Sequence, residues 1–160
     1  MMANLEMPVS EDELWMFKAL EEAKAALARD EVPIGAVAIY DGKIIGRGYN
    51  RKETDNDPTA HAEILALRQA AGHLGSWRLL EVTLYSTLEP CIMCAGAMIQ
   101  ARLYRLVYGA KDLRFGADGS VVDLLSNMLF NHQVVVSSGI LEDEAAALMR
   151  NFFRSLREDK

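Results

Sequence analysis

One stretch decides the fold class of this 160-residue chain: VTLYSTLEPCIMCAGAMIQARLYRLVYGA (82–110). It predicts a buried strand over VTLYST (82–87), a short helix that Pro90 opens over about 91–102, and another buried strand over RLVYGA (105–110). Strands that alternate with helices are typical of a layered α/β domain. We therefore expect a central sheet with helices on both faces.

Two further helices are expected before this stretch. Ser10 followed by Glu13 is the pattern of a capping box, which favours a helix over about 11–29. Asp57-Pro58-Thr59 predicts a second helix start, because proline is well tolerated in a first helical turn. That helix is expected over about 59–72.

A hairpin and a C-terminal segment complete the expected domain. Asp41-Gly42 joins VPIGAVAIY (32–40) to KIIGRGYN (43–50), and an Asp-Gly pair between strand-like runs is a strong hairpin signal. The remaining expected elements are a short helix near Val122–Leu125, a strand over 134–136 and a closing helix over 142–157. The chain contains no linker-like stretch or repeat, so the pattern predicts one α/β domain over residues 1–160 with about five strands.

The composition is that of an ordinary globular protein. Hydrophobic residues make up 51% of the chain and charged residues 25%, which argues against disorder and fibrous repeats. No apolar run approaches the roughly 20 residues of a membrane span, and MMANLEMPVSEDEL (1–14) lacks the pattern of a signal peptide. We therefore expect a soluble protein of the cytoplasm without a membrane partner.

The charge distribution bears on a nucleic-acid partner. A net charge of −6 argues mildly against such a partner, which usually leaves a basic footprint. Most of the surplus lies in the first 31 residues, so one acidic helix could account for it and leave another face neutral or basic. The basic residues that could contact phosphate, each of which could also be an ordinary solvated charge, are Arg51, Lys52, Lys111, Arg114, Arg150, Arg154 and Arg157.

Four residues carry the chemistry that the pattern favours: His61, Glu63, Cys91 and Cys94. A CxxC pair at a helix N-terminus has both sulfurs on one side of the first turn, where the helix dipole favours thiolates. Two thiolates and one imidazole suit Zn²⁺ and leave an open position, at which the pKa of water falls towards about 7. Glu63 is the natural proton shuttle, provided that His61 and Glu63 both lie at a helix end.

The cysteine pair has other interpretations. It could be a thioredoxin-like redox centre, although such a pair usually follows a first strand near the N-terminus, and a redox protein would bind no zinc. A closed structural zinc site would need a fourth ligand, for which His73 and His132 are the remaining histidines. Each of these histidines could equally be a surface or hydrogen-bonded residue.

Longer strings around these residues resemble a known family. They are DPTAHAEI (57–64), EPCIMCAGA (89–97), VPIGAV (32–37) and FFR (152–154). They closely resemble the bacterial tRNA-specific adenosine deaminases, whose zinc motif is shared by all cytidine-deaminase-like enzymes. The resemblance implies a three-layer α/β/α fold with a mixed sheet, a homodimer and one Zn²⁺ per subunit. It also implies that the partner is a tRNA anticodon stem-loop, whose wobble adenosine becomes inosine.

The resemblance assigns the chemical roles residue by residue. His61, Cys91 and Cys94 would bind zinc, and Glu63 would be the catalytic proton shuttle. In the implied reaction, Glu63 passes a proton from water to N1 of adenine, oxygen adds at C6, and Glu63 then protonates the leaving amine. The target base must leave its stack, which costs less in a loop with splayed bases than in a duplex.

The substrate-binding residues that the resemblance implies also have plainer interpretations. Asn50 would contact the target nucleoside, and Ile34, Val37 and Ala62 would line the base pocket. Asn50 could equally satisfy a turn, and Ile34 and Val37 could be ordinary core. Phe115 could stack on a base or fill a gap at a dimer interface. The loop that carries Phe115 is bulkier than the small-residue loop usual in the family.

Two rival functions remain at this point. A free-base or nucleoside deaminase of the guanine or cytidine type would use the same zinc and glutamate, and a closed pocket would favour it. An open basic groove would favour tRNA instead. A noncatalytic subunit of a deaminase complex would typically lack the glutamate, whereas Glu63 is present.

Overall fold

The computed structural model describes residues 9–159. In chain order its elements are α1 (Glu11–Leu27), β1 (Gly35–Tyr40), β2 (Lys43–Tyr49), α2 (Ala62–Leu74), β3 (Thr83–Leu88), α3 (Ile92–Gln100), β4 (Arg105–Ala110), β5 (Val135–Ser137) and α4 (Glu142–Glu158). Residues 1–8, which form most of the stretch tested above for a signal peptide, lie outside the described residues, as does residue 160. Most predicted boundaries move by no more than three residues.

The strands form one mixed sheet in the order β2-β1-β3-β4-β5. β1 pairs antiparallel with β2 and β3, whereas β3, β4 and β5 run parallel. This confirms the expected mixed sheet of five strands. Since β2 and β3 both run antiparallel to β1, they end at the same edge of the sheet. The helices that follow them, α2 and α3, therefore begin at one edge.

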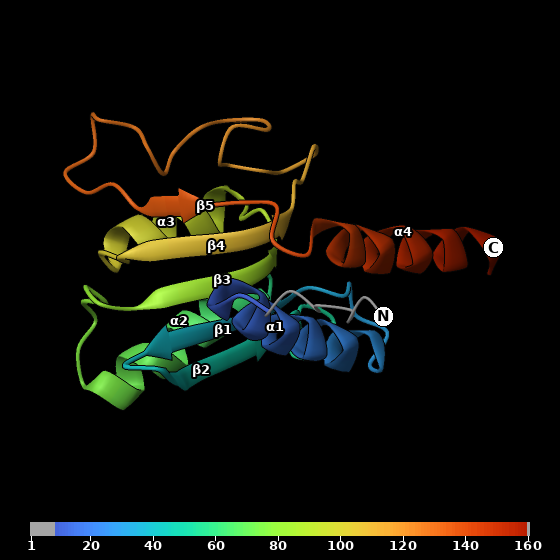
Figure 1. The fold of residues 1–160 in the computed structure, drawn as a ribbon. Helices are drawn as coiled ribbons and strands as arrows, with labels where there is room; N and C mark the ends of the chain where they lie inside the picture. The colour runs from blue at the N-terminus through green and yellow to red at the C-terminus, as the bar shows by residue number, and fades with distance from the viewer. Residues whose placement is uncertain (1–8, 160) are drawn as a thin grey trace, which may run out of the picture.

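Helices cover both faces of the sheet, which confirms the three-layer architecture (Figure 1). Leu84 and Leu106 pack into the core under α2 and α3. Their neighbours Tyr85 and Val107 point to the opposite face, where they pack against Met16 of α1. This division follows from the period of two along a strand, which sends successive side chains to opposite faces.

The closing helix packs on the sheet only near its N-terminus. Ala145 of α4 lies in a small core with Leu20 of α1 and Leu88 at the end of β3. From there α4 extends beyond the end of the sheet (Figure 1). Among residues 9–159, no helix combines the length and apolar character that crossing a membrane requires.

The second helix begins at Ala62, not near Thr59 as predicted. The side chain of Asp57 accepts hydrogen bonds from the backbone N–H and the hydroxyl of Thr59, each at 2.8 Å. These bonds close a separate turn before the helix. His61 then adopts an extended conformation, with φ −81° and ψ 149°. The later start places His61 at the N-cap position of α2.

The prediction of a short helix near Val122–Leu125 is wrong. This segment is among the described residues, and it contains turns and an isolated bridge. The backbone N–H of Val121 donates to the carbonyl of Gly116 at 2.9 Å, and that of Leu124 donates to Ala117 at 2.9 Å. These N–H groups are bonded back to the preceding loop. They are therefore not used in helical hydrogen bonds.

A partly buried ionic network fastens the start of α1 to the sheet. The carboxylate of Asp12 accepts hydrogen bonds from Arg105 at 2.8 and 3.0 Å and from the hydroxyl of Tyr85 at 2.7 Å. Arg105 also donates to the hydroxyl of Ser137 on β5 at 3.0 Å. The hydrogen bond from Arg105 is the main reason that the pKa of Asp12 lies below its ordinary value of 3.8.

We expect Asp12→Asn to lower the free energy of unfolding by about 1–2 kcal/mol at pH 7, between the values for exposed and buried charged pairs. Because the folded pKa of Asp12 is lowered, its contribution is present above pH 3.8 and is lost as the pH falls through the folded value. Urea denaturation at pH 7 and at pH 3 measures this difference. Glu21→Gln, which breaks the exposed pair of Glu21 with Lys18 on the same helix, is the control. An equal loss in both variants would contradict the prediction.

Candidate metal and catalytic site

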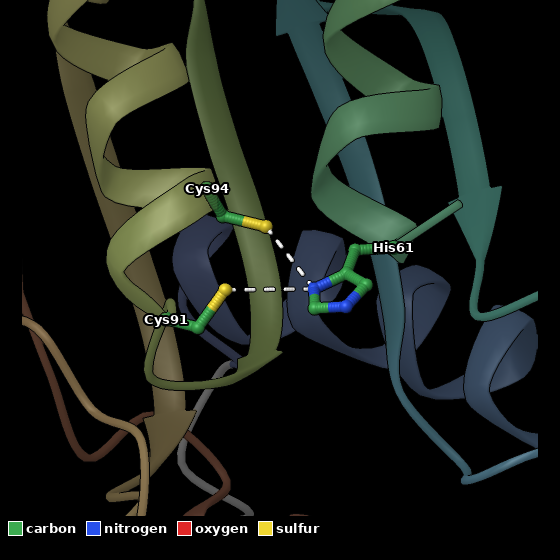
Figure 2. A group of neighbouring side chains, drawn as sticks. All are labelled: His61, Cys91 and Cys94. Carbon is green, nitrogen blue, oxygen red and sulfur yellow. Dashed lines mark hydrogen bonds between the residues drawn. The ribbon is translucent and has the colours of Figure 1, made fainter. Parts of the chain in front are cut away.

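The N-termini of α2 and α3 bring three predicted ligands together. His61 is the N-cap residue of α2, and Cys91 is the N-cap residue of α3. Both residues have extended backbones, so their side chains leave the helix ends and point into the space between the two helices (Figure 2). Cys94 lies one turn further along α3 and points into the same space.

The three side chains are close enough to share one ion. The Nδ1 atom of His61 lies 3.5 Å from the Sγ atom of Cys91 and 3.5 Å from that of Cys94. All three potential ligand atoms lie within 4.8 Å of one another, and both cysteines are free thiols. Two sulfurs and one imidazole nitrogen thus form a group that could hold a metal ion.

The electrostatics of this group reflect competition for protons. Hydrogen bonds, first from Cys94 and then from His61, lower the pKa of Cys91 to about 4. The same contact with Cys91, together with burial, raises the pKa of Cys94. The pKa of His61 is raised, chiefly by its hydrogen bond with Cys91. A metal cation bound between these side chains would stabilise both cysteines as thiolates at once, because its positive charge takes the place of the proton that they otherwise share.

Glu63 lies in the first turn of α2 beside this group, with only 4% of its surface exposed. Burial is the largest cause of its shift and raises its pKa to about 7. A carboxyl with that pKa can both accept and release a proton at neutral pH. The placement of His61 and Glu63 at a helix end meets the geometric condition set by the sequence.

A close contact between β2 and α2 fixes the position of this helix end. A Cβ atom added at Gly48 would lie 2.2 Å from the carbonyl oxygen of Ala62, so only glycine allows the strand to approach so closely. Ala62 and Ala66 are fully buried on the facing side of the helix. Small residues on both elements therefore hold the first turn of α2 tightly against the sheet.

The predicted substrate-side residues occupy different places. Asn50 is buried directly after β2, where its Oδ1 accepts a long hydrogen bond of 3.4 Å from the backbone N–H of Lys52. Ala62 begins α2, and the exposed Phe115 precedes Gly116, whose backbone forms a bridge with Cys91.

Ile34 and Val37 separate in the structure. Ile34 is partly buried just before β1 and packs against both the core under α2 and α3 and the small core that contains Leu20 and Ala145. Val37 is fully buried against α1, on the opposite face of the sheet from Cys94. The structure therefore does not bring Val37 to the metal group. Val37 instead lies among core residues, as its plainer interpretation expected.

The remaining histidines lie apart from the three clustered ligands. His73 is exposed in the last turn of α2, and the Nε2 atom of His132 lies 2.8 Å from the carbonyl oxygen of Leu103. Within residues 9–159, the cluster of potential metal ligands contains neither His73 nor His132. The group thus offers three candidate ligand atoms, the number that catalytic zinc sites take from the protein.

The predicted phosphate contacts are mostly exposed, but Arg51 is already engaged. Its guanidinium donates to Asp55 at 3.0 Å, and it also donates to the hydroxyl of Tyr49. The exposed members of the set are Lys52, Lys111, Arg114, Arg150, Arg154 and Arg157. Arg51 is therefore less available to phosphate than these residues.

Two buried carboxylates beside the site have no role in the sequence analysis. Glu31, counted there with the acidic first segment, accepts hydrogen bonds from the backbone N–H groups of Glu53 at 2.6 Å and Thr54 at 3.0 Å. Glu89 accepts hydrogen bonds from the loop that carries Phe115. Each carboxylate thus anchors one loop beside the helix N-termini. The only sequence signal for either anchoring role was the position of Glu89 next to Pro90 in the motif EPCIMCAGA (89–97).

Comparison with known proteins agrees with this chemistry. The MafB19-like deaminase family matches this chain over residues 10–157. A protein of Bacillus subtilis (strain 168) named tRNA-specific adenosine deaminase is 47% identical over 152 residues, which cover 95% of this chain and 94% of that protein. The similarity therefore includes both helix N-termini and the loops beside them.

Solved structures with the same fold include two kinds of deaminase. One comes from structural studies of A-to-I editing by tRNA:A34 deaminases at the wobble position; it has a TM-score of 0.81 and 49% identity, and the match covers 84% of this chain and 98% of that one. A guanine deaminase from Nitrosomonas europaea has a TM-score of 0.78 and 30% identity, covering 92% of this chain and 86% of that one. Of the two, the structure from the tRNA-editing study has the higher sequence identity.

Proposed function

We propose that this chain converts adenosine to inosine at the wobble position of a tRNA anticodon, because it belongs to the deaminase family that includes the bacterial tRNA-specific adenosine deaminases. The reaction is a hydrolytic deamination. The observation that carries this proposal is the group of His61, Cys91 and Cys94, with the buried Glu63 beside it and near-full-length similarity around it.

The metal that we propose is zinc, one ion per chain. Zn–S bonds are about 2.3 Å long and Zn–N bonds about 2.0–2.1 Å, so tetrahedral zinc separates a sulfur ligand from a nitrogen ligand by about 3.5 Å. The distances from His61 Nδ1 to the two Sγ atoms, both 3.5 Å, match this separation and support the proposal. When bound, zinc supplies the Lewis acidity that makes water a nucleophile near neutral pH.

Glu63 carries the proton through the reaction. It takes a proton from the attacking water and delivers it to N1 of adenine, which makes C6 a better electrophile. Once oxygen has added at C6, the carboxylate takes the remaining proton of that oxygen and passes it to the amine, which leaves as ammonia while the C6–O bond becomes the carbonyl of inosine. Its burial suits both transfers, because burial raises the pKa of Glu63 and so helps the carboxyl to hold a proton between them.

The substrate-binding residues that we propose lie on either side of the metal group. Asn50 and Ala62 belong to the β2–α2 side, and Phe115 belongs to the loop paired with Cys91. Asn50 retains the two donors of its amide group for a nucleoside, since the bond given above uses only its Oδ1 atom. Phe115 offers an exposed aromatic face, on which an unpaired base of the anticodon loop could stack.

An assay with parallel substrates tests the proposed function. The zinc-loaded protein is incubated with an arginine-tRNA anticodon stem-loop that carries a wobble adenosine, and inosine is measured by mass spectrometry. Free adenosine, cytidine and guanine are tested in parallel. Inosine at the wobble position alone would support the proposal. Deamination of a free base or nucleoside, with the stem-loop untouched, would retain the zinc chemistry and overturn the substrate.

We also propose a homodimer located in the cytoplasm, where tRNA is processed. Ile92, in the first turn of α3 beside Cys91, exposes 58% of its surface, and Leu113, in the loop bridged to Cys91, exposes 79%. Apolar side chains left open around a site are typical of a surface that another chain covers. Sedimentation equilibrium would test the dimer, and a monomer at micromolar concentration would contradict it.

A further inference from the structure

The carboxylate of Glu89 lies inside the loop formed by residues 112–120. Glu89 is 1% exposed and lies between β3 and the first proposed cysteine ligand. Its oxygens accept hydrogen bonds from the backbone N–H groups of Asp112 at 3.1 Å, Asp118 at 2.9 Å and Ser120 at 3.3 Å. The hydroxyl of Ser120 also donates to it. Both ends of the loop are therefore bonded to one side chain.

The backbone of this loop is also paired with the segment that follows Glu89. The N–H of Ala117 donates to the carbonyl of Pro90 at 2.8 Å, and Gly116 forms a bridge with Cys91. A Cβ atom added at Gly116 would lie 2.4 Å from the carboxyl group of Glu89. The loop thus passes so close to the carboxylate that residue 116 has no room for a side chain.

The outer side of the same loop is apolar and open. Leu113 exposes 79% of its surface and Phe115 exposes 66%. The turn that carries them is closed by Asp112, whose Oδ1 accepts hydrogen bonds from the N–H groups of Arg114 at 3.0 Å and Phe115 at 3.2 Å. Hydrogen bonds to two carboxylates, the backbone pairing with Pro90 and Cys91, and the buried Ala117 therefore hold this loop, while Leu113 and Phe115 stay exposed.

We propose that Glu89 is a positioning residue for substrate binding, which holds the 112–120 loop so that Phe115 meets an unpaired base next to the target nucleotide. This inference rests on the proposed function. Because Glu89 acts through backbone N–H groups of the loop, its loss should weaken binding of the stem-loop. The proton transfers of Glu63 should continue, since α2 and its contacts with the sheet are unchanged. The expected signature is a higher KM with little change in kcat.

Glu89→Gln tests this inference, because glutamine keeps the shape but presents an NH2 group to N–H donors that need an acceptor. Hydrogen exchange measured by mass spectrometry, without substrate, should be faster over residues 112–120 by about tenfold to a hundredfold, the loss expected for one hydrogen bond to a charged group. KM for the stem-loop should rise by about tenfold or more, with kcat within about threefold of wild type and zinc content unchanged.

A matched pair of milder variants keeps the test decisive if Glu89→Gln folds poorly. Ser120→Ala removes one hydroxyl that donates to Glu89, whereas Ser126→Ala removes a hydroxyl that donates to the exposed Asp123 in the same connection. Faster exchange and a higher KM in Ser120→Ala alone would support the inference. Equal effects in both serine variants, unchanged exchange over 112–120 in Glu89→Gln, or a fall in kcat at constant KM would overturn it.

The exchange measurement separates this inference from the proposed function. It requires no substrate, so it tests the anchoring of the loop even if the wild-type protein does not deaminate the stem-loop. In that case the proposed function fails, and faster exchange would still show that Glu89 anchors the loop. A KM effect accompanied by loss of the dimer, measured by sedimentation, would overturn substrate positioning as the role of the loop.

Discussion

Glu63→Gln is expected to retain the metal and the fold but to lose deamination by about 10²–10⁴-fold, the range typical of a lost general acid–base residue. Glutamine keeps nearly the same volume in this buried position, and it cannot accept the proton of water or return one to the leaving amine. Because Glu63 is not among the three clustered ligand atoms, its substitution should not release the ion. The loss should therefore appear in kcat.

The measurement combines metal analysis with steady-state kinetics on the stem-loop. Glu81→Gln is the control, since Glu81 is exposed just before β3, at the opposite end of that strand from Cys91. We expect wild-type kcat and KM for this control. Turnover by Glu63→Gln within about threefold of wild type would show that another group moves the proton.

The metal-binding residues could be predicted from the sequence because residues that are close together at a helix start are also close together in short sequence motifs. Cys91 and Cys94 are three residues apart at a helix start, where neighbouring turns bring such positions together. The distance between His61 and the cysteines was not readable in that way. It follows from the directions of β2 and β3, which end at one edge of the sheet and bring both helix N-termini there.

The pocket residues show where the resemblance needed a physical check. Ile34 and Val37 are an odd number of positions apart, so a continuous strand would send their side chains to opposite faces. The structure places Val37 against α1, whereas Ile34 contacts both the core under α2 and α3 and the small core formed with α1 and α4. Strand alternation accounts for the side of the sheet on which Val37 lies but not for Ile34, which lies just before the strand. The exact start of α2 could not be read in this way, because the side chain of Asp57 closes a competing turn.

The anchoring roles of Glu31 and Glu89 were out of reach of the sequence. A glutamate is rarely buried, and the residues next to it in the sequence do not indicate which backbone N–H groups it will contact. Both carboxylates are buried because they satisfy loop N–H groups that would otherwise lose their hydrogen bonds on folding. Such contacts depend on loop conformation, which local sequence patterns specify least.

His61→Ala is expected to lower zinc affinity by more than about 100-fold, since loss of a direct ligand should exceed the 10–100-fold cost of losing an outer contact. Deamination should fall with zinc occupancy. The midpoint of thermal unfolding should also fall, because an ion that binds only the folded chain stabilises it. Zinc titration, kinetics and calorimetry on the same preparations measure the three effects.

His73→Ala is the matched control, since His73 lies exposed at the other end of the same helix. It should retain wild-type zinc affinity, rate and thermal midpoint. The comparison also separates the interpretations of Cys91 and Cys94. A redox pair would bind no zinc in either variant, and a structural site with a fourth protein ligand would keep its ion after loss of one histidine. A zinc affinity of His61→Ala within about tenfold of wild type would contradict the three-ligand site, whereas weaker zinc binding and lost activity in that variant alone are the result we expect.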